Sequence, residues 1–79
     1  MSLNSRVSDI FQKIFKIEPE EFSPELRPED LLLWDSLGHM NLVMEIEDRL
    51  GVHFEADEIT EMTSAKKIVE LLQTKGVGD

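Results

Sequence analysis

The sequence predicts a small all-α protein, a four-helix bundle of three main helices and one short helix with a long loop between helices 1 and 2. Three stretches repeat apolar residues at the three- and four-residue spacing of one helix face. All three Pro residues fall between the first two of these stretches. A length of 79 residues allows one domain, which we expect to span residues 1–79.

The first helix is predicted over residues 3–16. Pro19 ends it, because Pro disfavours the helical conformation at the preceding residue, Glu18. The apolar residues of this stretch share one face: Leu3, Val7, Ile10, Phe11 and Ile14.

Residues 17–35 are predicted to form the long loop, because they hold the three Pro residues and scattered acids without helical periodicity. Loops longer than about 12–15 residues are uncommon in compact domains and are often functional. We expect Leu26 and the run Leu31–Leu33 to anchor this loop to the core.

The second helix is predicted over residues 36–50, with Asp35 as its N-cap and Gly51 as its stop. Its apolar residues cover a broad arc, which predicts a helix packed between two others: Leu37, Met40, Val43, Met44, Ile46 and Leu50.

The last main helix is predicted over residues 65–74, capped by Ser64 or Thr63 and stopped by Gly76. A short helix of one to two turns is expected around residues 56–61. Because the chain has no Cys, tight helix packing must provide the stability that disulfides give other small domains.

The charge restricts the classes of partner. Seventeen acidic residues against 8 basic ones give a net charge of −9, which argues against binding to nucleic acid or anionic membranes. Residues 17–36 and 45–61 each hold seven acids and one base, a net −6 each. These segments are either a solvated surface or a docking face for basic partners.

The sequence holds no pattern typical of catalysis or of metal binding. There is no Cys nucleophile, His39 and His53 lack a paired metal-ligand spacing, and no EF-hand, Walker or dinucleotide-binding motif is present. We therefore expect a protein that is not an enzyme and holds no metal. The longest apolar run is Leu31–Trp34, and the first residues lack a signal-peptide core, so we expect a cytoplasmic protein. We also expect a monomer.

One short motif carries a chemical prediction. Ser36 stands in the first turn of the second helix, directly after the long loop. It either fills a capped helix start behind Asp35 or displays a hydroxyl where helix N–H groups and the helix dipole tolerate an attached phosphate.

The motif Asp35-Ser36-Leu37, opening an acidic helix that ends in Ile46-Glu47-Asp48-Arg49-Leu50-Gly51, resembles the acyl carrier protein family. The resemblance extends over nearly the whole chain in motif, element order and charge. It implies that a phosphopantetheinyl transferase moves 4′-phosphopantetheine from coenzyme A onto Ser36, and that the arm's thiol holds acyl groups as thioesters. It also implies that Asp35 helps the transferase bind.

The resemblance further implies a partner-binding surface, formed by Leu37, Met44, Glu47 and Asp48. It would meet basic docking patches on loading ligases and downstream biosynthetic enzymes. The residues two and five positions after Ser36 are commonly acidic in fatty-acid carriers but are Gly38 and Asn41 here. This difference indicates a specialised lipid or polyketide-type pathway.

The cargo stays open at this point. An acyl pocket between the second and last helices would be lined by Ile46, Phe54, Ile59, Met62, Ile68 and Leu71, although plain core packing predicts the same residues. The leading hypothesis is a discrete acyl carrier. An aminoacyl or peptidyl carrier would use the same tether, and a non-covalent acidic helical adaptor for a basic partner would need none.

Overall fold

The computed structural model describes residues 2–78, so residues 1 and 79 of the predicted domain lie outside it. Four α-helices follow one another, and the described residues contain no strand, which confirms the predicted all-α class. The helices are α1 (Leu3–Phe15), α2 (Ser36–Leu50), α3 (Ala56–Thr60) and α4 (Ala65–Thr74). Two single 3₁₀ turns within the long loop, Pro19–Glu21 and Pro28–Asp30, were not predicted.

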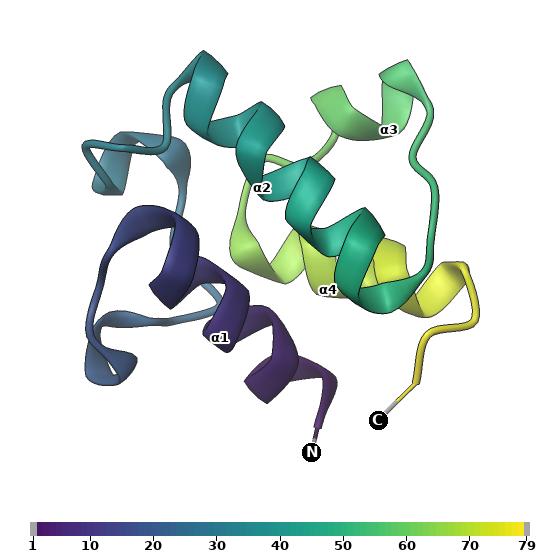
Figure 1. Ribbon diagram of the computed structural model, residues 1–79, viewed down its shortest axis with the longest axis horizontal. Coiled ribbons are helices and arrows are strands. Elements are labelled where there is room, and N and C mark those ends of the chain that lie inside the picture. The colour runs from purple at the N-terminus through teal and green to yellow at the C-terminus, as the bar shows by residue number, and fades with distance from the viewer. Residues whose placement is uncertain (1, 79) are drawn as a thin grey trace.

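Helix α1 packs against both α2 and α4, and the short α3 lies at one side of the molecule (Figure 1). The long loop between α1 and α2 occupies the opposite side in this view. The core residues come from all three main helices and from their connections: Leu3, Val7, Ile10, Phe11, Phe15, Trp34, Leu42, Val43, Ile46, Phe54, Met62, Ala65, Ile68, Val69 and Leu72. None of the helices within residues 2–78 has the length and hydropathy needed to cross a membrane.

Local capping signals set most helix ends. The Asp35 carboxylate accepts a hydrogen bond from the Gly38 N–H at 2.8 Å, and Gly51 ends α2 at a φ of 65°. Ser64, and not Thr63, caps α4, because its hydroxyl accepts a hydrogen bond from the Lys67 N–H. Helix α1 ends one residue before the predicted boundary, since Lys16 adopts a left-handed conformation with a φ of 57°.

Aromatic side chains anchor the long loop. Phe22 and Trp34 each meet the ring of Phe11 edge-on, with centroids 5.2 and 5.1 Å apart. The carbonyl groups of Pro24 and Leu26 also accept hydrogen bonds from the first two N–H groups of α4. Leu26 is partly buried against the core, in agreement with its predicted anchoring role.

The predicted anchoring by Leu31–Leu33 is wrong for two of the three residues. Leu31 is partly buried, but Leu32 is 94% exposed and Leu33 is 44% exposed. The Trp34 N–H bonds to the Leu31 carbonyl at 3.1 Å, which closes a turn with Leu32 and Leu33 at its tip. Trp34, only 2% exposed, fills the core position instead.

The broad apolar arc of α2 is buried only in part, which differs from the prediction. Only one side of the predicted arc is buried, and Leu37, Met40 and Met44 are exposed. Helix α3 has five residues and is too short to cover a helix of fifteen. The uncovered apolar side of α2 therefore faces solvent and begins beside Ser36.

Candidate functional site

Ser36 is the first residue of α2 and is exposed to solvent. Within residues 2–78, no other group forms a hydrogen bond with its hydroxyl. The neighbouring Asp35 carboxylate caps the helix through the Gly38 N–H, so it is not engaged by Ser36. The structure therefore combines the two interpretations of this motif: Asp35 is the cap, and Ser36 presents a free hydroxyl at the positive end of the helix dipole.

Gly38 keeps the preceding turn close to this helix start. A Cβ atom at position 38 would lie well inside van der Waals contact with the Leu33 carbonyl oxygen and 3.0 Å from its carbonyl carbon. Gly38 is itself buried. The absence of an acidic residue at this position therefore has a steric cause, because no side chain fits there.

A chain of two hydrogen bonds joins the long loop, α2 and α3 beside Ser36. The indole N–H of Trp34 donates to His39 Nδ1 at 2.8 Å. Because that nitrogen accepts, the proton of the neutral ring lies on Nε2, which donates to the Ile59 carbonyl at 2.9 Å. His39 is thus a satisfied structural histidine, as its half-buried position on the helix indicates.

A groove of about 680 Å³ opens next to Ser36. Its lining includes apolar side chains from the long loop, α2 and the α3 region, namely Trp34, Met40, Ile59 and Met62. Concave apolar surfaces of this size hold small ligands in many proteins. A group attached to the Ser36 hydroxyl would therefore have an apolar surface within reach.

The six residues of the candidate acyl pocket have different surroundings. Ile59 and Met62 line the groove beside Ser36, and Leu71 lines a separate cavity between α3 and α4. The remaining three, Ile46, Phe54 and Ile68, are core residues at most 3% exposed.

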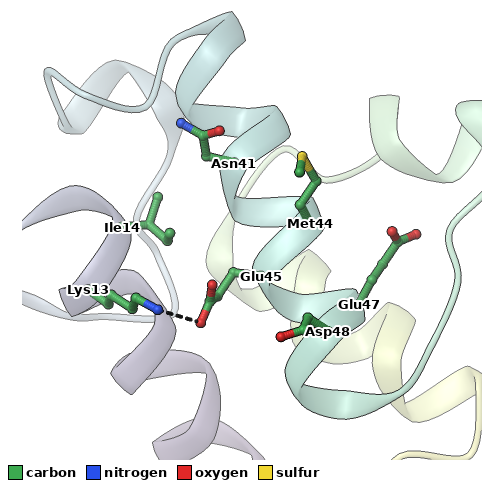
Figure 2. Close-up of a pocket in the computed structure, with 7 residues that line it drawn as sticks. All are labelled: Lys13, Ile14, Asn41, Met44, Glu45, Glu47 and Asp48. Carbon is green, nitrogen blue, oxygen red and sulfur yellow. Dashed lines mark hydrogen bonds and ion pairs between the residues drawn. The ribbon is translucent and has the colours of Figure 1, made fainter.

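The acidic residues along α2 differ in what they contact. Glu45 pairs with Lys13 of α1 at 3.1 Å, and Figure 2 shows this contact across the α1–α2 groove. Arg49, one turn along α2, also pairs with Glu45 at 2.6 Å. The hydrogen bond from Lys13 is the main cause that lowers the Glu45 pKa from its ordinary value of 4.5.

Glu47 and Asp48, both predicted to bind partners, also have different surroundings. The Glu47 carboxylate accepts a hydrogen bond from the Phe54 N–H at 2.8 Å and lies 3.4 Å from His53. Figure 2 shows its side chain extending toward the segment that follows α2. Asp48 is exposed, and no hydrogen bond or ion pair within residues 2–78 engages its carboxylate. Asp48 is therefore free to meet a partner, whereas Glu47 also holds the chain after α2.

Sequence reasoning missed three features of this site: the exposed turn at Leu32–Leu33, the steric role of Gly38, and the link of Glu47 to Phe54. The signal that could have revealed the exposed turn is the pair of Leu residues shortly before a capped helix start, because such turns rarely hold Leu. The other two depend on contacts between residues that the sequence pattern does not bring together.

A comparison with known protein families supplies independent information. A family model described as a phosphopantetheine attachment site matches residues 5–72. The match covers most of the chain, from α1 into α4, and includes Ser36. The local structure fits such a group, because an exposed, unbonded hydroxyl stands at a helix N-terminus beside an apolar groove.

Proposed function

The chain belongs to the phosphopantetheine attachment-site family, and we propose that within this family it is an acyl carrier whose arm is attached to Ser36. Family membership makes the protein a non-catalytic carrier of covalently attached 4′-phosphopantetheine. It also decides against the non-covalent adaptor. The type of cargo, the attachment residue and the pathway form the proposal.

The observation that supports Ser36 as the tether is its free hydroxyl. Attachment needs an oxygen that an enzyme can reach, and Ser36 is exposed in the first turn of α2. Attachment would form a phosphodiester bond at Ser36 Oγ, release the hydroxyl proton and displace adenosine 3′,5′-bisphosphate from coenzyme A. The phosphate would then lie near the N-terminal N–H groups of α2, which favour negative charge.

The remaining roles of the site belong to binding and positioning. The attached group supplies a thiol that holds cargo as a thioester. Asp35 holds the first turn of α2 in shape through the Gly38 N–H, so that Ser36 is presented in a fixed place. Leu37, 72% exposed, stands next to the tether as an apolar contact for enzymes that approach Ser36.

The groove beside Ser36 supports acyl over aminoacyl cargo. Hydrocarbon chains gain free energy when they leave water for apolar surface, at about 25 cal/mol per Å². Met40, which is 44% exposed, and the partly buried Ile59 offer such a surface, and the core residues Trp34 and Met62 also line the groove. A small polar cargo would gain little free energy from contact with these apolar side chains.

The exposed face of α2 supports docking of partner enzymes with basic patches. Leu37 and Met44 provide apolar contacts, and Asp48, with Glu47 beside it, provides negative charge. Asn41 is exposed and uncharged on the part of this face near Ser36, whereas Gly38 is buried and is not part of it. That arrangement supports a dedicated set of partners in a specialised lipid or polyketide-type pathway.

Intact mass spectrometry tests the proposal. Incubation with coenzyme A and a promiscuous phosphopantetheinyl transferase should add one phosphopantetheine mass to the wild-type protein. The Ser36→Ala variant should gain none, and Ser64→Ala, which removes another helix-start hydroxyl, should be modified like the wild type. Modification of Ser36→Ala, or none of the wild type with a transferase active on other carriers, would refute the assignment.

A further inference from the structure

Large exposed apolar side chains are concentrated around Ser36. All five in the described part of the chain fall within residues 32–44. Leu37, Met40 and Met44 lie on α2, and Leu32 and Leu33 form the tip of the turn before it. Scattered single apolar residues are normal on a surface, whereas a group of them next to a reactive position marks an interaction site.

The turn is an unusual place for two leucines. The central positions of such turns usually hold Gly, Asn, Asp, Ser or Pro, which suit the backbone and remain in water. Here Leu32 and Leu33 occupy them, and Leu32 is 94% exposed. Neither side chain belongs to the buried core cluster. Their place in the isolated chain therefore brings little stability.

The turn is nevertheless held firmly in place. Trp34, which follows it, is buried among the core aromatic rings. The carbonyl of Leu33 rests against Gly38 so closely that a side chain there would collide with it. These contacts fix the two leucines beside the first turn of α2, two and three residues before the cap Asp35. The apolar tip is thus presented to a partner without further ordering.

The charge around the turn specifies the partner's chemistry. Residues 27–44 hold three acids, Glu29, Asp30 and Asp35, against one base, Arg27, so their net charge is −2. All three acids are exposed. A second copy of this chain, with its net charge of −9, would be repelled from this surface. A partner with an apolar pocket bordered by basic side chains complements it.

We propose that the Leu32–Leu33 turn is a docking element for the phosphopantetheinyl transferase, which must reach Ser36 beside it. Leu32 enters an apolar pocket on the enzyme, and the flanking acids meet basic residues at its edge. This inference rests on the proposed function and adds to it a second contact surface, on the loop side of Ser36 and separate from the α2 face.

Steady-state modification kinetics test the inference. We expect Leu32→Asn to raise the KM for the carrier about tenfold, with little change in kcat, because a buried apolar anchor typically carries this share of binding. Leu32→Met keeps the apolar surface and should match the wild type. Because Leu32 is almost fully exposed, the thermal midpoints of both variants should equal that of the wild type.

The outcomes separate this inference from the function on which it rests. No modification of the wild-type chain refutes the proposed function, and the docking element with it. Modification of the wild type with a KM for Leu32→Asn within twofold of the wild-type value overturns the docking element alone. A loss shared equally by Leu32→Met, or one confined to kcat, also overturns it. Sedimentation that shows a wild-type dimer dissociated by Leu32→Asn would assign the turn to self-association instead.

Discussion

Replacing Gly38 by Ala puts a methyl group where the backbone of Leu33 already lies. In an ordinary helix this substitution stabilises the folded state by about 1 kcal/mol, because Gly loses more backbone entropy on folding. Gly38 is in a helix, so propensity alone predicts a gain. The structure predicts the opposite sign, since the new Cβ atom would overlap the Leu33 carbonyl.

The magnitude follows from which atoms collide. The clash is with a backbone oxygen and, at 3.0 Å, its carbon, and neither can rotate away as a side chain would. Overpacking costs about 1–3 kcal/mol, and a backbone clash belongs at the upper end of that range. After subtraction of the propensity gain, Gly38→Ala should lower the free energy of unfolding by about 2 kcal/mol. For a domain of this size, the thermal midpoint should fall by roughly 8–16 °C.

Thermal and urea unfolding followed by circular dichroism measure this difference. The matched control is Asn41→Ala, at an exposed position of the same helix. This substitution introduces a better helix-forming residue without a clash, so it should stabilise the protein by about 0.5 kcal/mol. A Gly38→Ala variant as stable as the wild type, or more stable, would refute the close approach of the turn to α2.

His39→Leu should lower the free energy of unfolding by about 1–3 kcal/mol, because the buried Trp34 indole N–H loses its acceptor. In a Trp34→Phe background, His39→Leu should lower the free energy of unfolding by less, as measured by urea unfolding. An equal loss of free energy in the two backgrounds would contradict the hydrogen bond. Lys13→Met should raise the Glu45 pKa toward 4.5, as measured by NMR titration, because its main stabilising partner is lost. Since the folded-state pKa is lowered, this pair stabilises the wild type above about pH 4.5 and less as the pH falls through the lowered value. An unchanged Glu45 pKa would refute the pairing.

The sequence predicted the features that depend on local signals. The bounds of α2 follow from Asp35 and Gly51, and the structure reproduces them because a cap and a left-handed stop act within one turn. The acidic helix with Ser36 at its start pointed to the family that the comparison supports.

The features that the sequence did not predict depend on contacts between separate segments. Periodicity cannot tell which members of the run Leu31–Trp34 turn inward, because a turn and not a helix sets their directions. The sequence also cannot show that the Leu33 carbonyl lies against Gly38. The broad apolar arc of α2 predicted burial, while the shortness of α3 left part of it exposed.

The central claim is that Ser36 carries the prosthetic arm, and the position of the added mass tests it most directly. The chain has six serines, at positions 2, 5, 8, 23, 36 and 64. After modification with coenzyme A and a transferase, tandem mass spectrometry of protease fragments assigns the phosphopantetheine to one of them. We predict that fragment ions place it on Ser36 alone. Fragment ions that place it on Ser23, on Ser64 or on any other residue would contradict the account.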